Sequence, residues 1–279
     1  GDVVEVGKSV SSKTARRVAV VISLIVGVIF GSQFNANWSE ILLMFNAQSF
    51  GTTDPQFGLD NGFYVFVLPG LKLVLAAVAM LLGVGLVFSV VTHVLMGGIR
   101  ITMPVNGRGL FSITKRCRRQ LGIWLMLNMF AWAVRQMIGV FDQLTVQGSR
   151  ITGASYTAVH ANIPVTFIMA ALTAILGVVL GIWLMRSHTL EGQASIGVRA
   201  SAALKAWRVP VTSIAVVVVV GLVLTVAWPV LLQRFRVNPN AQEMESTYIQ
   251  RNIDATRAAY GLDKLKTEQY KVTDKGEQG

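Results

Sequence analysis

Residues 73–91 have the sequence LVLAAVAMLLGVGLVFSVV, which contains no charged side chain and has no polar face. The hydrocarbon core of a bilayer is about 30 Å thick, so a helix that crosses it needs about 20 residues. Because lipid offers no partners to backbone N–H and C=O groups, a crossing segment of this kind has to be helical. A helix of a soluble protein would keep a polar face, so this stretch is typical of a membrane span.

Four further segments share this character, and together the five predict an all-α fold. The predicted spans cover about residues 17–34, 71–94, 121–141, 164–185 and 211–232. The composition agrees, with 53% hydrophobic and 14% charged residues in the 279-residue chain. We therefore predict a polytopic integral membrane helical bundle of five transmembrane helices over residues 1–232. Residues 233–279 are predicted to form an extracytoplasmic tail, the start of a larger outer domain.

Lysines and arginines fall almost entirely on one side of these spans. Four lie at or before the start of the first span, six between the second and third, and four between the fourth and fifth. The first and third loops together contain only Arg150. Since short cytoplasmic loops are enriched in Lys and Arg, the N-terminus is predicted to be cytoplasmic and the tail, although itself basic, extracytoplasmic. The net charge of +11 follows from this topology, so nucleic-acid binding is not predicted.

Short amphipathic segments flank the spans and are predicted to lie at the membrane surface as interfacial helices. They cover residues 38–50, 110–120 and 196–207. One more helix is predicted in the tail, where Asn238 can cap it, Pro239 suits its first turn and Gly261 ends it.

Two groups of apolar and aromatic residues are candidates for contacts with partner subunits. Aromatic residues of the first loop are expected in a belt at the outer membrane surface, and one amphipathic tail helix cannot bury its apolar stripe alone. The candidates are Trp38, Phe57, Phe63, Tyr64 and Phe66 in the first loop, and Tyr248, Ile249 and Ile253 in the tail.

Arg135 is the one charge well inside a predicted span, which makes it a candidate functional residue. A substrate or ion role competes with two structural roles, which are snorkelling to the surface and pairing with Asp142. No acidic residue lies deep in a predicted span, so a carboxylate relay for protons or sodium is not predicted. Asp54 and Asp60 could bind a cation together with Glu40, but the capping of turns by the two aspartates is favoured.

Catalytic, cofactor and metal sites are not predicted. The three histidines, His93, His160 and His188, fall on both sides of the predicted membrane, and no HExxH or paired-carboxylate spacing occurs. Cys117 is the only cysteine, which excludes an intramolecular disulfide. We therefore expect a protein that is not an enzyme.

Several strings of the sequence resemble one family. Residues 36–70, ANWSEILLMFNAQSFGTTDPQFGLDNGFYVFVLPG, resemble the signature stretch of Uncharacterised Protein Family 0182, large multi-pass membrane proteins of actinobacteria and cyanobacteria. Four more strings resemble it in the same order: HVLMGGIRI (93–101), GRGLFSITKRCRRQL (107–121), TGASYTAVHANIP (152–164) and VNPNAQEMESTYIQRNIDATRAAYGL (237–262). Ala158 departs from the family pattern, which has an acidic residue after Tyr-Thr.

The resemblance implies roughly seven spans followed by a large outer domain, and this chain looks like spans three to seven of that pattern. The family has no established activity, although some relatives lie beside genes for a secreted PDZ–Lon-like protease. We expect a scaffold in the bacterial cytoplasmic membrane that anchors an extracytoplasmic module and binds partner subunits, an envelope protease among the candidates, in a homo- or hetero-oligomer. The alternative is a transporter or channel for an envelope solute or lipid, with Arg135 near the pathway.

Overall fold

The computed structural model describes residues 12–105, 108–145, 153–187, 196–262 and 265. The helices are α1 (Ser12–Ala36), α2 (Trp38–Phe45), α3 (Leu68–Leu95), α4 (Lys115–Gly139), α5 (Ile163–Arg186), α6 (Ile196–Leu222), α7 (Trp228–Leu231) and α8 (Ala241–Ala259). The strands are β1 (Ile99–Val105) and β2 (Arg108–Ile113). Short helical turns extend the helices: η1 (Phe63–Val67), η2 (Val140–Leu144), η3 (Ala158–Asn162), η5 (Val223–Ala227) and η6 (Leu232–Val237).

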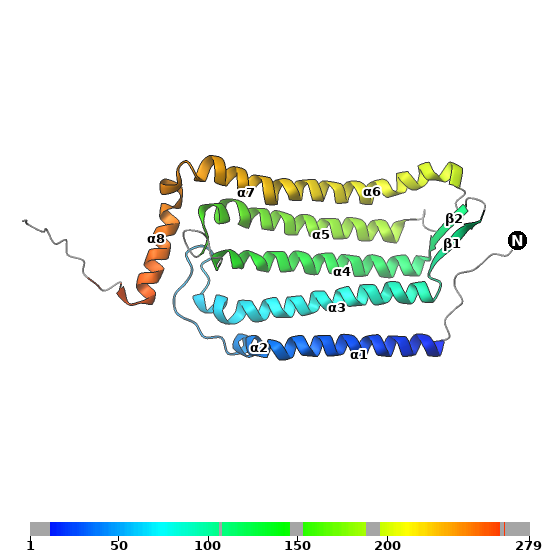
Figure 1. Ribbon diagram of the computed structural model, residues 1–279, viewed down its shortest axis with the longest axis horizontal. Helices are drawn as coiled ribbons and strands as arrows, with labels where there is room; N and C mark the ends of the chain where they lie inside the picture. The colour runs from blue at the N-terminus through cyan, green and yellow to red at the C-terminus, as the bar shows by residue number, and fades with distance from the viewer. Residues whose placement is uncertain (1–11, 106–107, 146–152, 188–195, 263–264, 266–279) are drawn as a thin grey trace, which may run out of the picture.

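The long helices lie side by side in one row, in the chain order α1, α3, α4, α5 and α6–α7 (Figure 1). α8 crosses one end of this row, and the β1–β2 hairpin lies at the other end. The loops that were predicted on opposite sides of a membrane therefore lie at opposite ends of the row.

Four continuous helical stretches in the described part of the chain are long and apolar enough to cross a membrane. They are Phe63–Leu95, Lys115–Leu144, Ala158–Arg186 and Trp207–Val237. Many of their valine, leucine, isoleucine and phenylalanine side chains are exposed, as expected where lipid is the solvent. The first predicted span falls within α1, a 25-residue helix that is not one of these four. Four apolar helices are therefore present, and a fifth crossing stays a prediction.

Three of these stretches contain a proline shortly after a π-helical turn. Pro69 follows η1, Pro164 follows η3 and Pro229 follows η5. A proline inside a helix has no N–H, and its ring clashes with the carbonyl four residues earlier. In each case that carbonyl lies within the preceding π-helical turn, whose wider geometry accommodates the ring without ending the helix.

The loop between α3 and α4 corrects part of the sequence prediction of a surface helix at residues 110–120. Residues 108–113 form a strand of a hairpin, and the helix over residues 115–120 is the start of α4. β1 and β2 pair antiparallel, with Ile99 opposite Ile113. The apolar residues of this segment are compatible with a strand when a second strand pairs with it. The helical spacing of apolar residues gives no information about whether such a strand is present. Thr114 then caps α4, which begins at Lys115. Apart from this hairpin, the described residues form helices and connecting loops.

The helix predicted at residues 196–207 is not a separate interfacial helix. α6 continues without a break through Pro210 into the fifth predicted span. The hydroxyl of Thr212 donates to the carbonyl of Arg208 and that of Ser213 to the carbonyl of Val209, at 2.6 and 2.7 Å. These hydroxyl groups bond back to carbonyls in the turn that contains Pro210, an arrangement that often bends a helix without ending it.

Two other predicted helices have different bounds. The helix predicted at residues 38–50 is α2 and ends at Phe45, where the side-chain amide of Asn46 donates to the carbonyl of Leu42. The tail helix α8 begins at Ala241 and not at Asn238, because η6 prolongs the preceding helical stretch to Val237.

α4 and α5 pack most closely of the described helices, through small residues. A Cβ atom on Gly122 would lie 2.8 Å from the carbonyl oxygen of Gly181, and one on Gly181 would lie 2.9 Å from that of Gly122. The side chain of Gln136 donates to the hydroxyl of Thr173 at 3.1 Å, and Asn128 links α4 to α3 in a similar way. Small residues and interhelical hydrogen bonds are the usual means of helix association in lipid.

Candidate functional site

Two aspartates organise the loop between α2 and η1, at the end of the bundle where α8 lies. Asp54, which is 7% exposed, accepts four hydrogen bonds of 2.6–2.9 Å, from the N–H groups of Gln56, Phe57 and Leu59 and the hydroxyl of Tyr64. Asp60 accepts from the hydroxyl of Ser49 and the N–H groups of Phe50, Gly51 and Gly62. The prediction that these aspartates cap turns is confirmed. Among the described residues, no group of three His, Cys, Asp or Glu side chains is placed to hold a metal ion.

These hydrogen bonds keep both aspartates ionised. Burial raises the pKa of Asp54, but the N–H of Phe57, the hydroxyl of Tyr64 and the two other N–H groups outweigh burial, so the pKa is lowered. The hydroxyl of Ser49, followed by the N–H groups of Phe50 and Gly62, lowers the pKa of Asp60 to about 2. An aspartate in an unfolded chain has a pKa of about 3.9.

The lowered pKa of Asp60 predicts how the loop responds to acid. A carboxylate with a depressed pKa adds stability above about pH 4, and this contribution is lost as the pH falls through about 2. We expect Asp60→Asn to reduce the protection of the amides of residues 49–62 against hydrogen exchange at pH 6, relative to the wild type. The difference between the two proteins should shrink as the pH falls below about 4 and vanish below about pH 2. A difference that persists unchanged at pH 2 would contradict this assignment.

Aromatic side chains of the same loop pack around Phe141 of η2. The ring centroids of Phe57, Phe63 and Tyr64 lie 5.0, 5.3 and 6.3 Å from that of Phe141, in edge-to-face geometry. Phe66 packs against Phe50 in the same way, at 5.5 Å. Four of the predicted partner-contact residues are thus partly buried by contacts within the chain. Trp38 on α2, in contrast, is 60% exposed.

Asp142 pairs with a different cation from the one predicted. Its carboxylate oxygens lie 2.8 and 2.9 Å from Nζ of Lys72, near the start of α3. The predicted pairing of Asp142 with Arg135 is therefore wrong, because a residue of the neighbouring helix takes the carboxylate. Arg135 is exposed on α4, and a snorkelling or functional role for it stays a prediction.

α8 is fixed to the bundle by a cluster at the start of the α5 stretch. Ser155 caps this stretch through its side chain, and the free N–H of the next residue, Tyr156, donates to the carboxylate of Glu245 at 3.2 Å. Glu245 lies on α8 and is 6% exposed. An anionic side chain at a helix N-terminus satisfies an unpaired N–H and interacts favourably with the helix dipole. Glu245 therefore joins α8 directly to one of the apolar helices.

Stacked and hydrogen-bonded rings surround this contact. The rings of Tyr156 and His160 stack at 4.0 Å, and Tyr248 of α8 meets Tyr156 edge to face at 6.2 Å. The Nδ1 atom of His160 lies 3.1 Å from the carbonyl oxygen of Tyr156, which can only accept, so Nδ1 carries the hydrogen. Burial raises the pKa of Tyr248, which therefore stays a neutral phenol.

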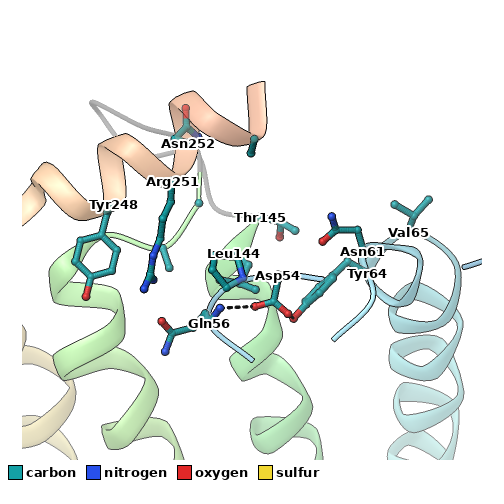
Figure 2. Close-up of a pocket in the computed structure, with 14 residues that line it drawn as sticks. Asp54, Gln56, Asn61, Tyr64, Val65, Leu144, Thr145, Tyr248, Arg251 and Asn252 are labelled. Atoms are coloured by element: carbon teal, nitrogen blue, oxygen red, sulfur yellow. Dashed lines mark hydrogen bonds between the residues drawn. The ribbon is translucent and has the colours of Figure 1, made fainter. Parts of the chain in front are cut away.

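A cavity of about 350 Å³ lies between α8 and the aspartate-bound loop. Figure 2 shows Tyr248 and Arg251 reaching from α8 toward Gln56, with Asp54 and Tyr64 on the opposite wall. Asp54 is the only carboxylate among the fourteen lining residues, and its hydrogen bonds to the loop engage both of its oxygens. The guanidinium of Arg251 lies 5.5 Å over the ring of Tyr248. The arrangement places one cation, Arg251, in the cavity wall and leaves no carboxylate of the wall outside the loop's hydrogen bonds.

The face of α8 that packs on the bundle coincides only in part with the predicted apolar stripe: the predicted contact residue Tyr248 lies on it. Glu245, Tyr248, Asn252 and Ala255 follow one another at helical spacing and face the bundle or the cavity. The stripe with Ile249 and Ile253 lies about a quarter turn away, since successive residues are about 100° apart. Ile249 is half-buried and Ile253 is 40% exposed. Sequence reasoning missed Glu245, Tyr156 and Phe141, because their partners come from distant parts of the chain.

The fold and the site together define a bundle of membrane-length apolar helices with a structured polar cap at one end. The chain belongs to the Uncharacterised protein family (UPF0182), whose family model matches residues 2–279. The predicted family resemblance is therefore confirmed.

Three relatives illustrate the match. The chain is 78% identical over 279 residues to a UPF0182 protein of Bifidobacterium adolescentis, an alignment that covers 100% of this chain and 26% of the relative. It is 36% identical over 265 residues to one of Kocuria rhizophila, covering 94% and 24%, and 34% identical over 247 residues to one of Corynebacterium glutamicum, covering 88% and 23%. The chain thus spans about a quarter of the length of these curated relatives. No solved structure matches it.

Proposed function

We propose that this chain is an integral membrane scaffold that anchors an extracytoplasmic module in the bacterial envelope. The observation that carries the proposal is that α8 lies across one end of the bundle and is held there by Glu245 and Tyr248 (Figure 1). A module attached to α8 would be positioned by the apolar helices and not by a flexible linker. In this proposal the hairpin end faces the cytoplasm, following the distribution of Lys and Arg, and α8 lies outside.

The exposed residues beside the docking face support a partner there. Ile253 is joined by Tyr260, Leu262 and Leu265, all of which are more exposed. Exposed apolar residues that gather on one part of a surface are typical of interaction sites. The relatives are about four times as long as the region matched by this chain, so their additional polypeptide is the first candidate for the module. A separate envelope subunit is the second.

The alternative proposal, a transporter or channel, has less support. It needs a pathway near Arg135, and Arg135 is not among the residues that line the cavity under α8. The scaffold proposal assigns no chemistry to the chain and needs no cofactor. It uses Arg251, in the wall of the cavity under α8, as a contact for a polar segment of the module.

Site-specific photo-cross-linking tests the proposal. A photoreactive residue at Ile253, in the protein expressed in its own envelope, is expected to attach to extracytoplasmic polypeptide that mass spectrometry then identifies. The matched control is Ala258, which is exposed on another side of the same helix. Glu245→Ala should reduce the yield at Ile253, because it releases α8. Cross-links only to lipid at Ile253, or equal yields at both positions, would contradict the scaffold.

A further inference from the structure

A groove lies between α5 and α6, toward the end of the bundle that carries the hairpin. Its volume is about 380 Å³. The two helices contact each other at two places along their length, one of them at the groove itself. The ring centroids of Trp183 and Trp207 lie 5.1 Å apart at one contact, and at the other a Cβ on Gly221 would lie 3.1 Å from Cε of Met169. The groove is therefore a space that the packing of the two helices leaves open.

The walls of this groove are apolar along most of its length. They consist of Val178, Val179 and Ile182 of α5 and Val209 of α6, with Trp183 toward the end. Val178 and Val209 are about half exposed in the chain alone. Stiff β-branched side chains form a smooth surface of fixed shape. Contact of this apolar surface with water is unfavourable in free energy. An acyl chain is the occupant that this lining fits.

The end of the groove is positively charged. Arg186 is the last residue of α5, is exposed, and pairs with no acidic side chain among the described residues. The carbonyl groups at a helix C-terminus carry partial negative charge, which would oppose a bound anion. Here the buried side chain of Arg118, 1% exposed, donates from Nη1 to the carbonyl of Ser187. A cation other than Arg186 therefore already compensates the end of α5.

We infer that this groove binds one anionic phospholipid, with an acyl chain against α5 and α6 and the phosphate at Arg186. The charge at the groove's end complements an anionic headgroup, and Arg208, which precedes Val209, adds a second exposed cation on α6. Basic pockets between transmembrane helices on the cytoplasmic side are a recurring type of anionic-lipid site. The inference rests on the membrane placement proposed above and is independent of the partner of α8.

Native mass spectrometry of the full chain in mild detergent tests this inference. The protein is mixed with phosphatidylglycerol or phosphatidylcholine, and the bound lipids are counted. The wild type should retain one phosphatidylglycerol in preference to phosphatidylcholine. Arg186→Gln should weaken that binding about fivefold, the factor expected for one cation near an anionic surface. Ile182→Trp should fill the groove and remove binding of both lipids.

Two matched controls keep the test specific. Arg135→Gln removes an exposed arginine from α4, and Val218→Trp adds the same bulk to an exposed position of α6, so both should bind lipid as the wild type does. Equal retention by wild type and Arg186→Gln, or equal retention of the two lipids by the wild type, would overturn the lipid site. A chain that stays monomeric and folded without detergent would instead overturn the membrane placement.

Discussion

Replacing Gly122 by valine is expected to lower the free energy of unfolding by about 3 kcal/mol, because the new side chain forces α4 away from α5. A Cβ at this position would lie 2.7 Å from Cγ of Met185 and 2.8 Å from the carbonyl oxygen of Gly181. The methionine side chain can rotate away, but the backbone oxygen cannot. The helices therefore have to separate, and the interhelical bond from Gln136 to Thr173 weakens with them.

The matched control is Gly139→Val at the other end of the same helix, where a Cβ would meet no atom within 4 Å. Near-ultraviolet circular dichroism during denaturant unfolding in detergent measures both variants. Because Gly122 and Gly181 share one contact, substituting both should cost less than the sum of the two single effects. Equal free energies of unfolding for Gly122→Val and Gly139→Val would show that α4 and α5 do not approach each other closely at Gly122.

Replacing Asp54 by alanine is expected to have the other large effect, a loss of about 3–5 kcal/mol in the local free energy that keeps the loop of residues 49–62 closed. The substitution leaves three N–H groups and the hydroxyl of Tyr64 without their acceptor. A buried donor without a partner costs about 1–3 kcal/mol, and part of this is recovered when the open loop is hydrated. The cavity beneath α8 should lose the wall that Asp54 organises.

Limited proteolysis measures this effect, because an open loop is cleaved faster while the apolar helices stay protected. Asp54→Asn keeps an acceptor oxygen and should give an intermediate cleavage rate. Asp254→Ala is the control, since that exposed carboxylate accepts one hydrogen bond, from Gln250 on the same helix. A cleavage rate for Asp54→Ala that matches the control would contradict the assigned role.

The long apolar helices could be predicted from the sequence because a lipid-facing helix needs apolar residues on every side. Such a run differs from the amphipathic surface helices of soluble proteins, as residues 73–91 illustrate. The turn-capping roles of Asp54 and Asp60 were also predictable, because aspartates next to proline and glycine act on their own neighbourhood in the chain. In both cases the determining interaction is local or is made with the solvent.

Other features depend on partners that are distant in sequence. Asp142 lies seven residues after Arg135 but pairs with Lys72 of the neighbouring helix. The hairpin at residues 99–113 needs β1 as the partner strand of β2. The polar docking face of α8 was not predicted, because apolar stripes are the usual signal for helix packing.

Labelling of single engineered cysteines in intact cells tests the central claim most directly, which is that the two ends of the bundle lie on opposite sides of the membrane. The native Cys117 is fully buried, so the unmodified chain provides the blank. Ala258→Cys on α8 should react with a membrane-impermeant maleimide in intact cells, whereas Met96→Cys, at a position 74% exposed next to the hairpin, should react only after permeabilisation. Rapid labelling of Met96→Cys in intact cells, or labelling of both positions alike, would contradict the account.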